Sequence, residues 1–367
     1  MKKIVHIITG LGSGGAENML YKTVKYSDRN LYHHEVISLI DKGVMGEKIE
    51  ALGIKVHSLN LNIKNLIQSF WDARKICREF DVINTWLYHA DIFGFLIAKT
   101  LPRKKIIWNV RHSNLDKKAN KSTTLKVVKL NSILSKYVNC ITYNSKLAYD
   151  NHLEFGYKEK KSFIIPNGFE LDKFKFSQEK RTKVRKNLNL NEMDKTIITV
   201  GRWNVQKDYK TLLLACNELK KDNIEFKLLM VGTNLDKNNV ELVNLIKKLD
   251  LTDNILLLGK RDDVPSLLSS ADLYVSSSIG ESFSNAIGEA MATELPCVVT
   301  DVGDSRIIVG ESGEVVQPKD FKALAKKIEN NLSRPYPQRN KIARKRVIDN
   351  YEIGSVVKKL EKIYADV

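Results

Sequence analysis

The chain has 367 residues, of which 43% are apolar and 28% charged, and its formal net charge is +17. This length suggests two domains and is enough to bury a large core without disulfides. The composition is that of a globular protein and excludes a disordered or fibrous class.

The cysteines give no sign of a metal site or a disulfide framework. The four cysteines are Cys77, Cys140, Cys216 and Cys297. They are far apart, and no histidine cluster has metal-ligand spacing, so we expect no metal and a reducing compartment.

No stretch approaches the roughly 18–20 apolar residues that span a bilayer. The apolar start, Met1–Ile8, is interrupted at Gly10 without a cleavage site, and we interpret it as the first strand of a cytoplasmic domain.

In the first half of the chain, short apolar runs alternate with amphipathic stretches. The expected strands are Lys3–Thr9, Glu35–Ile40, Lys55–Leu61, Val82–Trp86, Ile106–Val110, Cys140–Asn144 and Phe163–Ile165. Examples of the helices expected between them are Asn18–Tyr26, Leu66–Phe80 and Thr123–Tyr137. This alternation is typical of a parallel sheet with helices on both faces.

The pattern restarts in the second half. The expected strands are Thr196–Val200, Lys227–Val231, Ile255–Leu258, Leu273–Ser276, Cys297–Thr300 and Glu314–Val316. The expected helices are Tyr209–Lys221, Val240–Leu249, Ser284–Thr293 and Phe321–Leu332, and after Pro335 and Pro337 also Gln338–Asn350 and Gly354–Ala365. Between the halves lie the turn residues Pro166-Asn167-Gly168 and the polar, basic stretch Ser177–Lys195.

These patterns predict an α/β fold of two doubly wound, Rossmann-like domains that face each other across a cleft. We expect residues 1–168 to form the first domain and residues 169–350 the second. The last segment, 351–367, is expected to be a helix that can cross back to the first domain. In such sheets ligands bind at the carboxyl ends of the strands, so two facing domains would place the site between them.

A glycine-rich turn follows the first expected strand and opens the first expected helix. The stretch Gly10-Leu11-Gly12-Ser13-Gly14-Gly15 matches the G-x-G-x-x-G pattern of dinucleotide-binding folds. Glycines let a ligand approach the backbone, and the free N–H groups of a helix N-terminus attract an anion. An NAD site also needs an acid about 20 residues farther on. Asp41, 26 residues past Gly15, fits this poorly, and a turn without a ligand stays an alternative.

Two cations follow the first expected strand of the second half. Arg202 and Lys207 would lie at the carboxyl end of that strand. Together a planar guanidinium and a mobile ammonium suit a diphosphate. For either residue alone, a solvated loop charge is the alternative.

Two acids accompany a later strand and helix. Glu281 lies in the turn after the serine run, and Glu289 lies in the helix that follows. Ser282 or Ser284 can cap this helix, whose N-terminus would point at phosphate oxygens. Eight helical residues would separate the two acids by about 12 Å, which suits hydroxyl groups at two ends of one elongated ligand. An N-terminal acid and a surface acid on an amphipathic helix are the alternative.

Taken together, these motifs resemble the retaining GT-B glycosyltransferases of family 4. The resemblance is carried, in the family's order and over nearly the whole chain, by Gly14-Gly15-Ala16-Glu17, Pro166-Asn167-Gly168, Arg202 with Lys207, and Glu281 with Glu289. It implies retaining transfer of a hexose-type sugar from a nucleotide-sugar donor, expected to be UDP-linked, to a saccharide acceptor. It also implies that the first turn is the transferase version and not the NAD one.

The resemblance also assigns roles. Arg202 and Lys207 would stabilise the departing diphosphate, Glu289 would hold the ribose hydroxyls, and Glu281 would contact the donor sugar. The expected catalytic residues are His112, Glu281, Arg202 and Lys207. The expected donor-binding residues are Gly14, Gly15, Arg202, Lys207, Arg261, Glu281, Ser282, Phe283, Ser284, Asn285 and Glu289. The expected acceptor-side residues are Trp86, His89 and Arg111. Ile307 departs from the family pattern, which often has Glu there.

Mechanism and cofactor use follow from the same residues. A leaving diphosphate must be neutralised by a metal ion or by fixed cations. No Asp-x-Asp follows an expected strand, so we expect Arg202, Lys207 and helix N-termini to act without a metal and without any cofactor besides the donor. Structural roles are the alternative for His112 and for the segment around Trp86.

The excess positive charge indicates an anionic partner. Residues 99–149 hold twelve Lys or Arg and one acid, Asp116. With two helices expected to be amphipathic, this favours peripheral binding to the inner face of an anionic membrane and a lipid-linked acceptor, such as an undecaprenyl saccharide of capsule or O-antigen assembly. The helices are Lys64–Arg78, with Leu66, Ile67, Phe70 and Trp71, and Thr123–Tyr137, with Leu125, Val128, Lys129, Ser132 and Lys136. For the charge, a solvated basic surface of a Lys- and Asn-rich protein is the alternative. For the apolar stripes, burial in an ordinary core is the alternative.

Other functions remain open at this stage. Nucleic-acid binding would explain the charge, but no helix-turn-helix, zinc or RNA-binding motif is present. A GT-B-fold sugar-nucleotide epimerase, a transferase with a soluble acceptor, and a non-catalytic module that binds a nucleotide sugar or a membrane are the alternatives.

Overall fold

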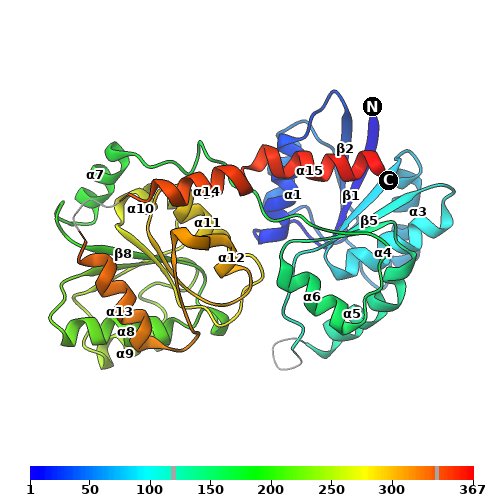
Figure 1. Ribbon diagram of the computed structural model, residues 1–367. Helices are drawn as coiled ribbons and strands as arrows, with labels where there is room; N and C mark the ends of the chain where they lie inside the picture. Colours follow the sequence, from blue (N-terminus) through cyan, green and yellow to red (C-terminus); the bar gives the residue numbers. More distant parts are fainter. Residues whose placement is uncertain (117–120, 335–338) are drawn as a thin grey trace. The chain divides into compact units, whose positions relative to one another are not determined.

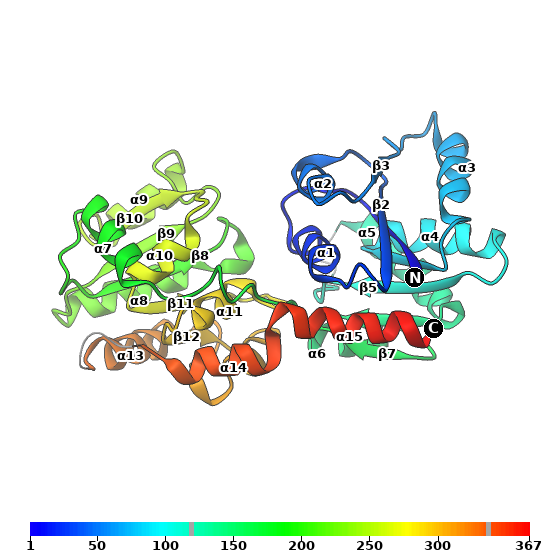
Figure 2. The same ribbon diagram turned by 90° about the horizontal axis from the view of Figure 1, so that it is seen from above.

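The computed structural model describes residues 1–116, 121–334 and 339–367. It separates into two compact units, residues 1–168 with 353–367 (unit 1) and residues 169–352 (unit 2). The expected fold class is confirmed, because each unit is a doubly wound α/β unit around one parallel sheet (Figures 1 and 2). The chain returns to unit 1 after Glu352, two residues later than expected. Pro335, Pro337 and the expected helix start at Gln338 lie outside the described residues.

Unit 1 alternates strands with helices. Its elements are β1 (Lys2–Ile8), α1 (Gly15–Tyr26), β2 (Tyr32–Ser38), α2 (Gly43–Glu50), β3 (Val56–Ser58), α3 (Leu66–Cys77), β4 (Val82–Trp86), α4 (Tyr88–Thr100), β5 (Lys105–Val110), α5 (Ser122–Leu134), β6 (Cys140–Tyr143), α6 (Lys146–Phe155), β7 (Ser162–Ile164) and α15 (Ile353–Asp366). The strand order is β3-β2-β1-β4-β5-β6-β7, so the direction of winding reverses between β1 and β4.

The core of unit 1 lies on both faces of this sheet. On β1, Val5 and Ile7 join the cluster beneath α3 to α6, whereas Ile4 and Ile8 join the cluster beneath α1, α2 and α15. Such two-sided burial explains the near-continuous apolar run of the strand. Among the described residues, no helix combines the length and the apolar character needed to cross a membrane.

A chain of hydrogen bonds crosses unit 1 and holds α15 on it. The indole of Trp86 can only donate, so His6 accepts at Nδ1 (3.2 Å) and carries its proton on Nε2. His6 Nε2 then donates to His34 Nδ1 (2.9 Å), and His34 Nε2 donates to Ser27 Oγ (2.8 Å). Ser27 in turn donates to Glu361 Oε1 on α15 (2.7 Å). This arrangement requires both imidazoles to be neutral.

These histidines make the stability of the protein sensitive to acid. Burial, and next the charge of His33, lowers the pKa of His34 to about 4, and burial lowers the pKa of His6 well below its usual value. Below pH 6.5 the unfolded chain binds protons that the folded chain does not, so stability is full above 6.5 and falls toward pH 4. From His34 alone we expect the free energy of unfolding to be about 2 kcal/mol lower at pH 5 than at pH 7. Urea unfolding measures this, and His34→Gln should reduce the difference between the two pH values; an unreduced difference would contradict the assignment.

Unit 2 repeats the architecture. Its elements are α7 (Gln178–Asn187), β8 (Thr196–Val200), α8 (Tyr209–Lys221), β9 (Lys227–Val231), α9 (Val240–Lys248), β10 (Ile255–Gly259), α10 (Val264–Ser270), β11 (Leu273–Ser276), α11 (Asn285–Ala292), β12 (Cys297–Thr300), α12 (Ser305–Val309), β13 (Glu314–Val316), α13 (Phe321–Leu332) and α14 (Lys341–Tyr351). The strand order is β10-β9-β8-β11-β12-β13, all parallel, so the winding reverses between β8 and β11.

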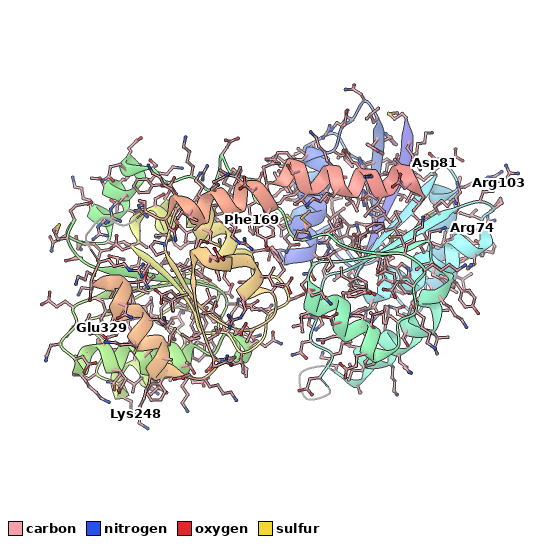
Figure 3. All side chains as sticks on the ribbon, in the orientation of Figure 1. Arg74, Asp81, Arg103, Phe169, Lys248 and Glu329 are labelled. Carbon is pink, nitrogen blue, oxygen red and sulfur yellow. The ribbon has the colours of Figure 1, made fainter. Side chains whose placement is uncertain are left out.

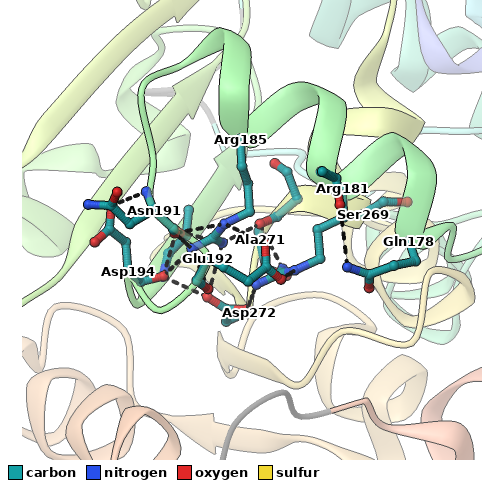
Figure 4. A network of polar contacts seen from close by, with 12 residues as sticks. Gln178, Arg181, Arg185, Asn191, Glu192, Asp194, Ser269, Ala271 and Asp272 are labelled. Atoms are coloured by element: carbon teal, nitrogen blue, oxygen red, sulfur yellow. Dashed lines mark hydrogen bonds and ion pairs between the residues drawn. The ribbon is translucent and has the colours of Figure 1, made fainter.

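The basic stretch between the two halves contains helix α7, which buries two arginines. Arg181 and Arg185 are 0% and 1% exposed. Arg181 Nη2 lies 3.0 Å from Asp272 Oδ1, and Arg185 Nη1 lies 3.6 Å from Asp272 Oδ2 (Figure 4). Both guanidiniums also donate to the carbonyl of Ser270 at the end of α10, at 2.9 and 2.8 Å. Helix α7 is thus attached to unit 2 by buried charged pairs, whereas an ordinary surface helix is attached by an apolar stripe.

Candidate active site

The polar residues expected to bind the donor gather where the winding of unit 2 reverses. The loop after β8 carries Arg202 and Lys207, and the loop after β11 carries Glu281. Ligands of open α/β sheets bind at such a reversal point, outside the carboxyl ends of the strands. The topology of unit 2 therefore places these charges where a nucleotide would bind.

Lys207 and Glu281 form a direct ion pair. Lys207 Nζ lies 2.5 Å from Glu281 Oε1, and the two side chains are 23% and 13% exposed. Ser278 Oγ donates to the same carboxylate oxygen (2.9 Å), and Ser277 Oγ donates to the carbonyl of Lys207 (3.0 Å). Arg202 is exposed, and no carboxylate in the described part of the chain pairs with it. The site thus holds one cation balanced by an acid and one available to an anion.

Two glycines let the loops pack tightly around this pair. A Cβ on Gly201 would lie 2.8 Å from the Tyr209 hydroxyl and 3.1 Å from Lys207 Cε. Gly303 has a φ of +55°, and its Cβ would lie 2.5 Å from the Glu281 carbonyl oxygen. Both contacts exclude a side chain, so both loops depend on glycine for their course.

The aromatic wall beside the pair consists of Trp203 and Tyr209. Their rings are stacked at 5.7 Å with an interplanar angle of 6°. Burial, and next the negative charge of Glu281, raises the pKa of Tyr209. Its hydroxyl therefore stays protonated and can act as a hydrogen-bond donor but not as a base.

Helix α11 differs from the expectation in two details. It begins at Asn285, so Glu289 lies only four residues into the helix, a rise of about 6 Å, and Glu281 precedes it in the turn. The expected helical spacing of about 12 Å between the two acids was therefore wrong. Ser284 is the N-cap but makes no side-chain capping bond. The Phe283 side chain is buried against Phe169 (6.1 Å between ring centroids), so only the backbone of Phe283 could meet a donor.

Arg261 lies at the end of a different strand from Arg202, Lys207 and Glu281. It follows β10, the edge strand two positions from β8. Its guanidinium forms a bidentate pair with Asp263, Nε to Oδ1 at 2.8 Å and Nη2 to Oδ2 at 2.7 Å. The hydrogen bonds to Asp263 raise the pKa of Arg261.

In unit 1, four expected residues lie at the corresponding ends of strands. Gly14 and Gly15 are exposed where α1 begins after β1, and His89 is exposed at the start of α4 after β4. A Cβ on Gly14 would lie 2.3 Å from Glu17 Oε2, so the Glu17 carboxylate lies over this glycine. His112 follows β5, and its ring lies edge-on to that of Tyr88 at 6.5 Å.

Two expected acceptor-side residues serve the core instead. Trp86, expected on the acceptor side, is 0% exposed, so its side chain is not accessible to an acceptor. Its indole starts the hydrogen-bond chain to α15. The guanidinium of Arg111 lies 5.0 Å over the Trp86 ring and donates to the carbonyl of Ile165 (2.9 Å) and to Asn167 Oδ1 (3.3 Å). Arg111 therefore holds the end of unit 1 in place through Ile165 and Asn167.

Ser277, Ser278 and Tyr209 also belong to the site, although no role was predicted for them. The first two hold the backbone of Lys207 and the carboxylate of Glu281, and Tyr209 lies against Gly201. Three consecutive serines at the end of a buried strand were the available signal. Hydroxyl groups are unusual at buried positions unless they hold neighbouring groups by hydrogen bonds.

Family models cover both units. Residues 13–173 match the model described as Glycosyltransferase Family 4, and residues 180–350 match the model described as Glycosyl transferases group 1. This chain belongs to the family 4 glycosyltransferases. The family of the transferase is thus the one that its motifs resemble. The two matches correspond to the two halves of the chain.

Curated relatives include enzymes of bacterial glycoconjugate assembly. The transferase is 25% identical over 323 residues to the UDP-Gal:alpha-D-GlcNAc-diphosphoundecaprenol alpha-1,3-galactosyltransferase of Escherichia coli, covering 84% of this chain and 81% of that one. It is 23% identical over 292 residues to the capsular polysaccharide biosynthesis glycosyltransferase CapH of Staphylococcus aureus, covering 79% of each. The match to N-acetyl-alpha-D-glucosaminyl L-malate synthase of Bacillus anthracis, 28% identical over 201 residues, covers 54% of this chain and about half (52%) of that relative.

Solved structures share the fold of the transferase over its whole length. Anabaena Alr3699/HepE, in complex with UDP, superposes with a TM-score of 0.88 at 20% identity and covers 100% of both chains. A glycosyltransferase from Rickettsia africae superposes with a TM-score of 0.83 at 23% identity, covering 100% of this chain and 98% of that one.

Proposed function

We propose that the transferase moves a sugar from a UDP-linked donor to a saccharide acceptor carried on a polyprenyl diphosphate, in the assembly of a bacterial surface polysaccharide. The observation that carries this is the cluster of Arg202, Lys207 and Glu281 at the reversal point of unit 2. The printed name of the Escherichia coli relative, with its UDP-Gal donor and diphosphoundecaprenol acceptor, supports the choice of substrates. So does the UDP bound to the Anabaena protein.

In the proposed reaction the bond between the anomeric carbon and the diphosphate oxygen breaks, and its electron pair leaves with the diphosphate. The acceptor hydroxyl oxygen bonds to the same face of the carbon, and its proton passes to the departing diphosphate oxygen. Arg202 and Lys207 stabilise the charge that develops on the diphosphate. Glu281, which holds Lys207 in place, accepts hydrogen bonds from hydroxyls of the donor sugar, and Glu289 accepts those of the ribose.

The two cations also support transfer without a metal ion. A fixed cation aimed at the leaving group supplies the stabilisation that a divalent metal supplies elsewhere. We therefore expect transfer to continue at its full rate in excess EDTA. Loss of transfer in EDTA and its recovery with Mg²⁺ or Mn²⁺ would contradict the metal-independent mechanism.

The donor is tested by thermal shift with UDP-, GDP- and dTDP-sugars. A ligand at about 100 times its Kd stabilises the folded state by about 2.7 kcal/mol, which gives a measurable rise in Tm. We expect UDP-sugars to raise Tm and GDP-sugars to leave it unchanged; the reverse would overturn the choice of base. Consumption of the donor only when a polyprenyl-diphosphate saccharide is present would separate a transferase from an epimerase, which needs no acceptor.

A further inference from the structure

Helix α3 exposes several of its apolar side chains to solvent. Its core-facing side holds Ser69, Ala73 and Cys77, which are at most 4% exposed, together with Phe70 and Ile76, which are partly buried against the core. Ile67 lies two positions before Ser69, and Trp71 lies two positions before Ala73, so both lie on the opposite side of the helix. They are 76% and 55% exposed. An ordinary surface helix carries polar side chains on its outer side. Figures 1 and 2 show α3 at the margin of unit 1.

The turn before α3 extends this face. Ile63 is 97% exposed and lies one helical repeat before Ile67 in the sequence. The turn is ordered by two asparagines, because Asn65 Oδ1 accepts from the Asn62 N–H (2.7 Å) and Asn62 Oδ1 accepts from the Lys64 N–H (2.9 Å). An ordered turn thus presents an isoleucine to solvent, which costs free energy unless something covers the side chain.

Basic side chains border the apolar face. Arg74 lies with its guanidinium carbon 5.4 Å from the centre of the Trp71 ring. Lys75 and Arg78 follow on the next turn, and Lys104 donates to the carbonyl of Arg78 (2.7 Å). Figure 3 labels Arg74 and Arg103 on this side of unit 1. The acids on α3 and directly after it are Asp72 and Glu79, so the border is net positive.

The second helix expected to be amphipathic does not join this surface through the expected residues. On α5, Val128 is 0% exposed and Ser132 is 4% exposed, so the expected apolar stripe faces the core. The apolar side chains that α5 exposes are others, among them Leu130 (44%) and Ile133 (56%). The surface is therefore defined by Ile63, Leu66, Ile67 and Trp71, bordered by Lys64, Arg74, Lys75 and Arg78, and is called the α3 face.

We propose that the α3 face is a docking surface for an anionic lipid bilayer. Exposed Ile, Leu and Trp side chains insert at the headgroup boundary, and Lys and Arg beside them pair with anionic headgroups. A net positive border favours this occupant over a second copy of this chain, whose own α3 face has the same charge. The inference deepens the proposed function, because an acceptor anchored in a bilayer must be met at its surface.

The test is flotation of the full-length protein with vesicles of phosphatidylcholine, with and without phosphatidylglycerol. We expect the protein to float with the anionic vesicles at low salt and to be released at high salt. Ile67→Ser with Trp71→Ser should lower the fraction bound by at least about tenfold. Arg74→Gln should lower it about fivefold. Ile342→Ser, which removes an equally exposed isoleucine (73%) from α14 in unit 2, is the matched control and should bind like the parent.

Two further readouts separate the possible failures. UDP binding by the Ile67→Ser, Trp71→Ser variant, measured by calorimetry, should equal that of the parent, since the α3 face is distant in sequence from the donor cluster and lies in the other unit. Equal vesicle binding by this variant and the parent would overturn the docking surface while leaving the proposed function intact. A concentration-dependent dimer that the variant abolishes, seen by sedimentation, would also overturn it in favour of a protein partner. Failure of the parent to bind any UDP-sugar would instead overturn the proposed function.

Discussion

Replacing Lys207 by alanine is expected to lower the rate of sugar transfer, with donor in excess, by about 10–100-fold or more. A charge-assisted hydrogen bond is worth about 1.5–3 kcal/mol, and it acts here on charge that grows in the transition state. The loss also removes the cation that lies 2.5 Å from Glu281. The Glu281 carboxylate is then left unbalanced beside an anionic diphosphate. The measurement is the initial rate of UDP release in the presence of acceptor.

A control and a double variant make this result specific. Lys210→Ala removes an exposed lysine from the same helix region and should leave the rate unchanged. Because Lys207 and Glu281 contact each other, the cost of Lys207→Ala with Glu281→Gln should be smaller than the sum of the single costs. A rate close to the parent's in Lys207→Ala would remove Lys207 from the catalytic residues, and additive costs would show that the pair does not act as a unit.

Replacing Asp272 by alanine is expected to lower the free energy of unfolding by about 3–5 kcal/mol, a large share of the stability of an ordinary domain. Asp272 is 10% exposed and is the buried carboxylate opposite Arg181 and Arg185 (Figure 4). Without it, two buried guanidiniums lose their countercharge, which is the costly way to break such a pair. Urea unfolding measures the loss as a lower midpoint.

The matched control is Glu192→Ala. Glu192 also pairs with Arg181 (3.0 Å) but is 50% exposed. Solvent screens that pair, so the expected cost is below about 1 kcal/mol. If the two variants lost equal amounts of stability, burial would not be the reason for the strength of the α7 anchor.

The strands of both sheets were predictable because parallel strands buried on two faces have continuous apolar runs. Helices were harder where their apolar pattern is atypical. Helix α4 is apolar on nearly all sides and carries little 3.6-residue periodicity. Helix α7 was hard to predict for the opposite reason, because it has almost no apolar residues. Its buried face consists of Arg181, Val184 and Arg185. A sequence cannot show that an arginine is buried until its partner, here Asp272 some ninety residues farther along the chain, is known.

For the candidate site, the approximate position was predictable and the contacts were not. Lys207 and Glu281 both follow central strands, and the carboxyl ends of parallel strands meet at one edge of a sheet. That they would pair directly depends on side-chain directions set by Ser278 and Gly303, which spacing does not reveal. Trp86 is the last residue of a central strand, yet it is buried, and its indole hydrogen-bonds to His6 within the unit.

A crystal structure of the transferase with UDP bound tests the donor site directly. We expect the diphosphate to lie at the carboxyl ends of β8 and β11, with oxygens about 3 Å from Lys207 Nζ and from the Arg202 guanidinium. UDP bound away from both side chains, or held only by other residues, would contradict it.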